Sequence, residues 1–204
     1  MLITGIRSKP VYKPLEPDAG GRHHLLLGHG VGGEQLCGLI AALEANPATR
    51  AASRRVLYVA DASATAETIG KVKVAKVTDL QTFPDTAALL TVFRDLLSAS
   101  VMGTRLYVAG PETFIGLVMR IAAEFNLNND EIRAEECGSA ARRVHCIHCR
   151  SAMENVKTNI VTCSGCGRSL IVRDHYSRRL AAYMGVMVDA EAPGELPPIQ
   201  EVFV

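Results

Sequence analysis

Four cysteines, arranged as two closely spaced pairs, constrain this chain more than any other feature of its sequence. The pairs are Cys146 with Cys149 and Cys163 with Cys166, and thirteen residues separate one pair from the other. Each Cys-x-x-Cys turn can supply two thiolates, so two turns can supply the four corners of a tetrahedral metal site. The sequence therefore predicts a four-cysteine metal ribbon over residues 142–185.

The identity of the metal is a separate question. Two disulfides or two unrelated pairs would be the alternative to a metal, but the spacing is that of a ribbon and the chain shows no secretory signal. Zinc is the commoner occupant of a closed four-thiolate site, and a single iron, as in rubredoxins, is the alternative. Rubredoxin turns tend to read Cys-Pro-x-Cys-Gly, whereas the first pair here is followed by Arg150 and only the second by a glycine, Gly167. We therefore expect zinc.

Composition limits the classes of protein to which the chain can belong. A length of 204 residues allows one ordinary domain and a small one, and 48% hydrophobic with 21% charged residues fits a soluble globular protein. The net charge of +1 and the absence of Trp give no support for a nucleic-acid partner. No apolar run is long enough for a membrane span and the start does not resemble a signal peptide, so we expect a cytoplasmic protein with reduced thiols.

Strands alternate with helices between residues 23 and 138, after an extended lead-in over residues 1–22. Apolar runs predict strands near residues 25–27, 55–60, 105–109 and 131–135, and Val72, Val74 and Val77 suggest a short third strand. Helical spacing of apolar residues predicts helices near residues 36–43, 84–99 and 113–125. This α/β alternation predicts a parallel five-stranded sheet covered by helices on both faces.

A glycine-rich turn follows the first strand of this sheet. The pattern GxGxxG is formed by Gly28, Gly30 and Gly33, with Gly32 beside them, and a helix follows. Such a turn lets backbone approach a pyrophosphate at a helix N-terminus, and Asp61 after the second strand lies where a ribose would be bound. A structural tight turn is the alternative, and Glu34 in the first helical turn would repel a phosphate.

Two segments resemble one known family. Leu25–Leu36 is similar to the glycine-rich stretch of ferredoxin–NADP reductase-like proteins, including the phthalate dioxygenase reductase group, and Tyr107–Glu112 is similar to their Tyr-Val-Cys-Gly-Pro signature. The resemblance covers about residues 23–137, the NAD(P) half of those enzymes. It implies that Gly110, Pro111 and Glu112 lie at the nicotinamide edge. No flavin-binding barrel precedes this half, so a flavin would have to come from a partner polypeptide.

This chain departs from the reductase pattern at three places. The family's Thr-Pro pair is Glu34-Gln35 here, and the Cys that lies beside the nicotinamide is Ala109. No Arg follows the second strand to hold a 2′-phosphate, so Asp61 favours NADH over NADPH if a nucleotide binds.

The C-terminal segments resemble a second, more specific family. The ribbon, the run Arg173–Arg179, the Ala182–Gly185 segment and an acidic proline-containing tail over residues 186–204 follow one another in order. This order resembles the small A-type subunit of bacterial dimethylamine monooxygenase, over nearly the whole chain. The resemblance implies a multi-subunit, NAD(P)H-dependent N-demethylating monooxygenase. Its partner subunits, a flavin and iron–sulfur reductase subunit and a haem oxygenase subunit, would carry flavin, [2Fe–2S] and haem.

Three hypotheses follow for function. The chain could present nicotinamide to a flavin on a partner subunit, or it could be a non-catalytic assembly subunit that the metal staples together. In the third hypothesis, a rubredoxin-like iron at the four cysteines relays electrons. No residue is suited to oxidise an amine by itself, so we expect the isolated chain to be inactive. The proline-containing tail cannot form a core of its own, so we expect it to lie across a partner or across its own domain.

Overall fold

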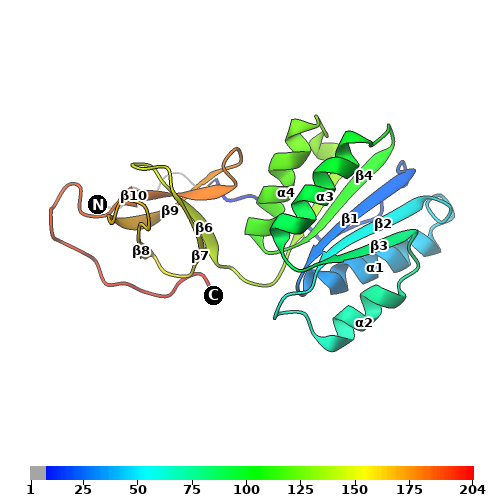
Figure 1. Ribbon diagram of the computed structural model, residues 1–204, viewed down its shortest axis with the longest axis horizontal. Coiled ribbons are helices and arrows are strands. Elements are labelled where there is room, and N and C mark those ends of the chain that lie inside the picture. The colour runs from blue at the N-terminus through cyan, green and yellow to red at the C-terminus, as the bar shows by residue number, and fades with distance from the viewer. Residues whose placement is uncertain (1–7) are drawn as a thin grey trace. The chain divides into compact units, whose positions relative to one another are not determined.

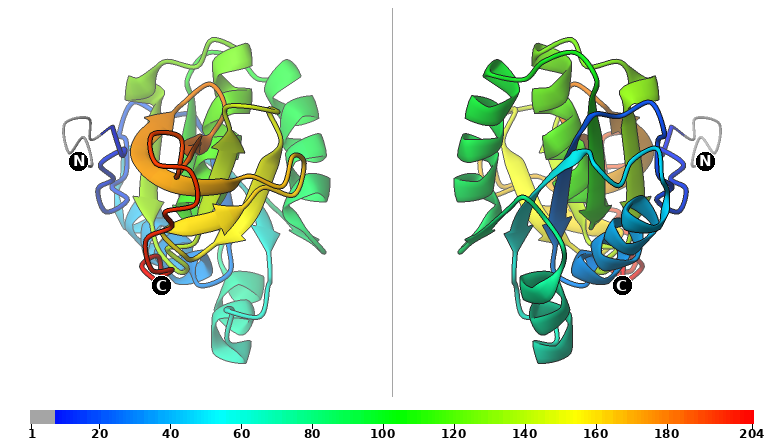
Figure 2. Two further views of the ribbon diagram at one scale, coloured as in Figure 1. Left: turned by 90° about the vertical axis from the view of Figure 1, so that its left-hand side faces the viewer. Right: turned by 90° about the vertical axis from the view of Figure 1, so that its right-hand side faces the viewer.

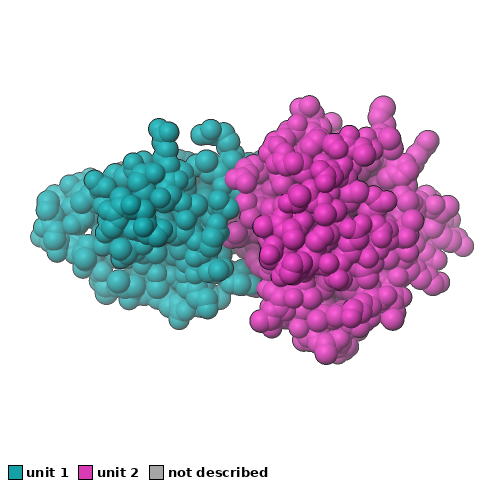
Figure 3. All heavy atoms as spheres, viewed as in Figure 1, with its two compact units in different colours: residues 1–11, 139–204 teal, residues 12–138 magenta. Residues whose placement is uncertain are grey.

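The computed structural model describes residues 8–204, which divide into two compact units (Figure 3). The sheet unit is Tyr12–Gly138, and the ribbon unit comprises Ser139–Val204 together with the described residues before Tyr12. Each unit has its own buried core, so each is described by itself. Within the described residues, no helix is long and apolar enough to cross a membrane.

The sheet unit contains five parallel strands joined by helices (Figure 1). In chain order the elements are β1 (His23–His29), α1 (Gly32–Ala45), β2 (Ser53–Val59), α2 (Ala66–Val74), β3 (Asp79–Phe83), α3 (Thr86–Ser98), β4 (Thr104–Gly110), α4 (Glu112–Glu124), the short 3-10 helix η1 (Asn129–Glu131) and β5 (Ile132–Glu136). The strand order is β3-β2-β1-β4-β5, and every pairing is parallel. The predicted parallel five-stranded sheet is confirmed.

Helices cover both faces of this sheet, and each face has its own core. Successive residues of a strand point to opposite faces, so Leu27 packs with Phe93 of α3 on one face while Leu26 packs with Leu36 of α1 on the other. Figure 2 shows α1 and α2 on one side of the sheet and α3 and α4 on the other. Because both faces of β1 are buried, consecutive residues of the strand are apolar and do not alternate with polar ones.

The third strand lies later in the sequence than predicted. Val72 and Val74 belong to α2, where Val72 is buried and Val74 is 82% exposed, and the strand at this place is β3. The helix is favoured by the Thr65 side chain, which accepts a hydrogen bond from the Thr68 N–H at the helix N-terminus. An ion pair between Glu67 and Lys71, one helical turn apart, adds to it. These local contacts override the strand preference of valine.

The ribbon unit is a second five-stranded sheet made of two hairpins and a strand between them. Its strands are β6 (Arg142–Cys146), β7 (Ala152–Val156), β8 (Ile160–Thr162), β9 (Ser169–Ser177) and β10 (Ala182–Met187). The order is β7-β6-β10-β9-β8, with β10 antiparallel to β9 and parallel to β6. The segment that follows β9 in the sequence therefore supplies the central strand.

The N-terminal segment has no helix or strand from Ser8 to Arg22. Ser8 contacts β9 of the ribbon unit, because its hydroxyl accepts a 2.7 Å hydrogen bond from the Tyr176 N–H. Tyr12 and Leu15 pack against the cores of the sheet unit. The first part of the expected lead-in, residues 1–7, lies outside the described residues.

Candidate functional site

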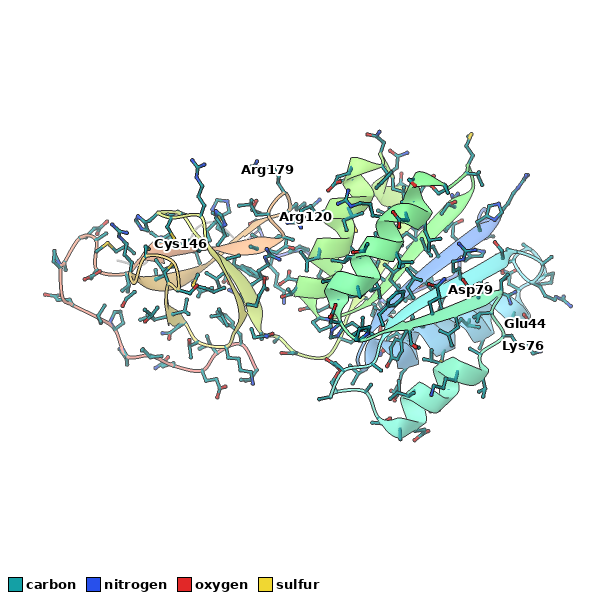
Figure 4. The ribbon with its side chains drawn as sticks, in the orientation of Figure 1. Glu44, Lys76, Asp79, Arg120, Cys146 and Arg179 are labelled. Atoms are coloured by element: carbon teal, nitrogen blue, oxygen red, sulfur yellow. The ribbon has the colours of Figure 1, made fainter. Side chains whose placement is uncertain are left out.

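The four cysteines of the ribbon lie together at one place. Cys146 ends β6, Cys149 lies in the turn between β6 and β7, and Cys163 and Cys166 lie in the turn between β8 and β9. Their four sulfur atoms lie within 4.8 Å of one another. Figure 4 labels Cys146 among the strands of the ribbon. Two hairpins that are not neighbours in the sheet therefore present their turns to a common centre.

The distances between the sulfurs fit a tetrahedral metal better than a disulfide. The Sγ atoms of Cys146 and Cys166 are 3.8 Å apart, and those of Cys149 and Cys163 are 3.5 Å apart. A metal–sulfur bond of about 2.3 Å in a tetrahedron gives sulfur–sulfur distances of roughly 3.8 Å, whereas a disulfide bond is about 2.05 Å long. All six cysteines of the chain are free thiols. The donor set is therefore that of a closed four-thiolate metal site.

The two cysteine turns have the same backbone construction. The Arg150 N–H donates to the Cys146 carbonyl, and the Gly167 N–H donates to the Cys163 carbonyl, each at 2.9 Å. The residue after the second cysteine has positive φ in both turns, 66° for Arg150 and 72° for Gly167. Glycine adopts this conformation without strain, but an arginine does not. The unstrained turn at Gly167 therefore has a strained counterpart at Arg150 in the first turn.

Burial and hydrogen bonding divide the four thiols into two kinds. Hydrogen bonds from Ser151 lower the pKa of exposed Cys149 to about 6, and hydrogen bonds from Arg168 lower the pKa of Cys166. Burial raises the pKa of Cys163 to about 11. A bound cation would favour the thiolate form of this buried group. The Nε2 atom of His148, next to Cys149, accepts from the Met187 N–H at 3.3 Å.

The glycine-rich turn lies at the point where the sheet reverses its strand order. The strand β1 has β2 on one side and β4 on the other, and the chain visits these neighbours in opposite directions. Such a reversal leaves a crevice at the carboxyl ends of the strands, which is where open α/β sheets bind ligands. The turn follows β1 and Gly110-Pro111 follows β4, so the two predicted motifs meet here. A Cβ atom on Gly110 would lie 3.0 Å from the Cβ of His29.

The glycines of the turn also have structural roles. Gly30 has φ of 57°, and a Cβ atom there would lie 2.1 Å from the Ser63 hydroxyl oxygen. A Cβ atom on Gly32 would lie 2.3 Å from the Ala109 carbonyl oxygen, so α1 can pack against β4 only with glycine at this position. Side chains of α1, α2 and β2 surround Gly28 and Gly33. Tight packing therefore explains part of the motif without a ligand.

Asp61 lies beside the turn, as predicted, and neighbouring residues already bind its carboxylate. Its Oδ1 atom accepts from the Ser63 N–H at 2.9 Å and from the Ser63 hydroxyl at 2.5 Å. Burial opposes ionisation, but the Ser63 hydrogen bonds and the His29 ring, whose Nδ1 is 3.4 Å from Oδ2, outweigh it and lower the pKa of Asp61. The Ser63 hydroxyl also accepts from the Val31 N–H at 3.3 Å, so this backbone donor next to the start of α1 already has a partner.

The two glutamates near the turn are held by different elements. Glu34 lies in the first turn of α1, and its Oε1 atom accepts from the Thr68 hydroxyl of α2 at 2.9 Å. Glu112 begins α4 and is only 6% exposed, and a carboxylate at a helix N-terminus is favoured by the helix dipole. Together with Asp61, they give this end of the sheet three carboxylates.

Sequence reasoning missed three residues that shape the turn. Tyr58 of β2 donates its buried hydroxyl to the Gly30 carbonyl at 2.6 Å, and burial raises its pKa to about 12. The ring of His29 packs against that of Phe114, with 5.3 Å between centroids, and burial lowers the pKa of His29. Ser63 is the third. Each of the three lies within a few residues of a predicted motif. The motif does not reveal which neighbouring side chains face the turn, because that depends on how the strands pair.

A shallow groove on the sheet unit lies away from this crevice. It has a volume of about 490 Å³ and lies between α1 and α2, with Cys37, Ile40 and Val74 among the residues that line it. Glu44 and Lys76, labelled in Figure 4, also line it and are 3.8 Å apart. The residues of the glycine-rich turn do not line this groove.

Comparison with protein families matches both units. The N-terminal domain model of dimethylamine monooxygenase subunit DmmA-like proteins matches residues 4–132, and the C-terminal domain model of the same proteins matches residues 143–186. The chain belongs to this DmmA-like family. The predicted family resemblance is therefore confirmed, and its two family domains correspond to the sheet and the ribbon.

A curated relative and several solved structures are also similar to this family member. The δ subunit of a haem-dependent oxidative N-demethylase from Ectopseudomonas mendocina is 35% identical over 130 residues, which cover 64% of this chain and 74% of the relative. The ferredoxin reductase of carbazole 1,9a-dioxygenase has a TM-score of 0.41 at 17% identity, covering 61% of this chain and 34% of the reductase. The Amycolatopsis cytochrome P450 reductase GcoB has a TM-score of 0.42 at 16% identity, covering 63% and 42%. The chain thus spans less than half of either reductase.

Proposed function

We propose that this chain is a subunit of a multicomponent, NAD(P)H-dependent dimethylamine monooxygenase that carries out oxidative N-demethylation. Its part would be to present nicotinamide to a flavin on a partner subunit. The expectation of an oxidoreductase subunit agrees with the family and with the name of the δ-subunit relative. The observation that carries the proposal is the meeting of the glycine-rich turn and Gly110-Pro111 at the strand-order reversal.

Each predicted residue has a part in this proposal. The glycines that would seat the pyrophosphate are Gly28, Gly30, Gly32 and Gly33. Asp61 would accept hydrogen bonds from the ribose hydroxyls, which favours NADH over NADPH, after exchanging those that it now accepts from Ser63. Gly110, Pro111 and Glu112 would border the nicotinamide. Because a flavin supplies the hydride-accepting chemistry in such systems, this chain's own work is binding and orientation.

For the ribbon, we propose that Cys146, Cys149, Cys163 and Cys166 hold zinc, with iron as the alternative. Support comes from the sulfur–sulfur distances and from the first turn, which lacks the Pro and Gly of rubredoxin turns. The metal would pin the two hairpins so that the ribbon can hold a partner subunit. Absorption separates the two metals, because ferric thiolate is red and zinc thiolate is colourless; metal analysis of the purified protein provides an independent count.

A second candidate function is a non-catalytic, metal-stapled assembly subunit. The specific observation in its favour is the Ser63 hydroxyl, which takes the Val31 N–H that a phosphate would use. Three carboxylates at this end of the sheet also disfavour an anion. In this alternative the glycines serve only the packing of α1 against the sheet.

Calorimetry of NADH and NADPH distinguishes the two candidates. Titrations use the purified chain alone and with the flavin and iron–sulfur reductase subunit. Gly30→Leu would place a side chain against Ser63 and Asp61 and should abolish binding, whereas Gly38→Leu, on the exposed side of α1 with nothing within 4 Å of its Cβ position, is the matched control. Saturable binding that only Gly30→Leu removes supports the nucleotide role. No binding in either titration would leave the assembly role, and demethylase activity of the isolated chain would contradict both.

A further inference from the structure

The C-terminal tail forms an anchored loop on the outside of the ribbon unit. It leaves β10 after Met187 and returns to the ribbon near β7, as Figure 1 shows in red. Nearly all of its residues from Ala190 onward are exposed. The proposed reductase role uses none of them.

Hydrogen bonds hold both ends of this loop. At the first end, the Val188 N–H donates to the Ser169 carbonyl of β9 at 3.0 Å, and the Asp189 carboxylate accepts from the Gly194 N–H at 3.1 Å, which closes a turn within the loop. At the second end, the Asn159 side chain donates to the Pro198 carbonyl at 3.1 Å and accepts from the Gln200 N–H at 2.7 Å. The Phe203 ring lies 3.8 Å from the guanidinium carbon of Arg142, which continues the attachment into the core of the ribbon. The tail is therefore held in one place along most of its length.

The loop between these anchors displays apolar side chains. Leu196 is 55% exposed and Ile199 is 68% exposed, and they flank Pro197-Pro198. A residue that precedes a proline is restricted to extended conformations, which applies here to both Leu196 and Pro197. Such a segment has little conformational freedom to lose on binding, and extended proline-containing segments are common ligands of aromatic-lined grooves.

The same loop carries unbalanced negative charge. Glu191 and Glu195 lie within it and Glu201 follows it, and among the described residues none of the three has an ion-pair partner. Arg142 and Arg143 of the ribbon pair with Asp174 and Glu154 and not with these carboxylates. Exposed apolar side chains between unpaired carboxylates suit a partner whose groove has a positively charged rim.

We infer that residues 191–199 are a docking loop that inserts Leu196 and Ile199 into an apolar groove, rimmed by Lys or Arg, on another subunit of the oxygenase. The identity of the partner rests on the proposed function, but the loop's mode of binding does not involve the nucleotide. The anchors at Val188 and Asn159, with the turn closed by Asp189, keep the loop in its binding conformation and so contribute to the affinity.

The test measures the affinity of the full-length chain for the purified flavin and iron–sulfur reductase subunit and for the haem subunit. The double variant Leu196→Asp with Ile199→Asp should weaken binding to one of them at least tenfold. Met102→Asp changes an apolar residue of the sheet unit that is 97% exposed and should leave binding unchanged. Glu191→Lys with Glu195→Lys should also weaken binding and reduce its dependence on salt.

A second variant tests the anchoring separately from the contact. Asn159→Ala keeps Leu196 and Ile199 but frees one end of the loop, and it should weaken binding about threefold to tenfold. Unchanged affinity of the double variant would overturn the inference. So would a wild-type chain that binds neither subunit. If the double variant instead abolishes self-association in sedimentation, the occupant is a second copy and the inference is wrong. NADH calorimetry on the same variants is expected to be unchanged, so failure of the nucleotide role is recognised independently.

Discussion

The sheet unit and the ribbon unit are stabilised in different ways. In the sheet unit, helices on both faces bury two clusters of large apolar side chains, including Leu26, Leu27 and Phe93. In the ribbon unit there is a single cluster, and two of its buried members are the metal-site residues Cys146 and Cys163. Small sheets bury too little apolar area to be stable alone, and a metal or disulfides usually make up the difference.

This difference teaches where each unit is vulnerable. A domain with a large core should stay folded when the metal is removed, but it should lose stability when a central apolar side chain is truncated. A domain built around four thiolates should show the opposite behaviour. The predictions below test this contrast, from the largest expected effect to the smallest.

Removal of the metal should unfold the ribbon unit and leave the sheet unit intact. Binding of a structural zinc contributes roughly 10–16 kcal/mol in small metal-dependent domains. Hydrogen exchange after treatment with a strong chelator, or in Cys163→Ala, should therefore show lost protection over residues 142–187 and unchanged protection over residues 23–136. Cys37→Ser is the control, because Cys37 lies on α1 outside the cluster. Protection of β6 and β9 without metal would contradict the contrast.

Truncation of the central side chain of α3 should have the converse effect. Phe93 is fully buried among residues of α3, α4 and the sheet, so Phe93→Ala should lower the free energy of unfolding of the sheet unit by about 3–5 kcal/mol. Denaturant unfolding followed by the helical circular dichroism signal measures this loss, because the helices belong to the sheet unit. Met102→Ala, at an exposed site, serves as the control. A change in metal content in Phe93→Ala would show that the two units are not independent.

The two cysteine turns should respond in opposite directions to exchange of their positive-φ residues. Gly167→Ala should destabilise the ribbon by about 1–2 kcal/mol, because its Cβ position is open and only the backbone conformation is strained. Arg150→Gly should stabilise it by less, roughly 0.5–1 kcal/mol, because the added freedom of the unfolded chain offsets part of the relieved strain. Competition for the metal with a chromophoric chelator would report both. If both substitutions weakened metal binding, or both strengthened it, the positive-φ residues of the two turns would not have equivalent roles.

The smallest predicted effect concerns the glycine-rich turn. Ser63→Ala removes the hydroxyl that accepts from the Val31 N–H and donates to Asp61, so both groups become available to a nucleotide. We expect the affinity for NADH to rise about twofold to fivefold, less than 1 kcal/mol. Calorimetry would measure the change, with Ser98→Ala at the end of α3 as the control. Weaker binding in Ser63→Ala would mean that Ser63 contacts the ligand itself.

The sequence predicted the elements that have strong local signals. The cysteine spacing placed the metal ribbon, and buried apolar runs placed β1, β2 and β4 of the parallel sheet. It failed at β3, an edge strand without a fully buried residue, because its hydrophobic signal is weak. No strand was predicted at β10 either, although it is apolar and central, because its place depends on pairing with the hairpins on both sides. Pairing with neighbouring strands decides whether such segments form strands, and their amino-acid composition does not reveal that pairing.

The candidate site was predictable to a similar degree. Motif spacing located the glycine-rich turn, Asp61 and Gly110-Pro111, and the structure brings them to one end of the sheet. The contact between Ser63 and the turn depends on how the loop after β2 folds back, which no motif encodes. The strain at Arg150 was equally hidden, because an arginine gives no sign of positive φ.

The place of β10 in the ribbon sets the order in which this unit can be built on the ribosome. The chain emerges from its N-terminus, so all four cysteines leave the ribosome before the strand that separates β6 from β9 does. Metal loading can therefore precede completion of the sheet, and the central strand then inserts between two hairpins already joined at their turns. The metal would then act as a template on which the last strand of the ribbon is added.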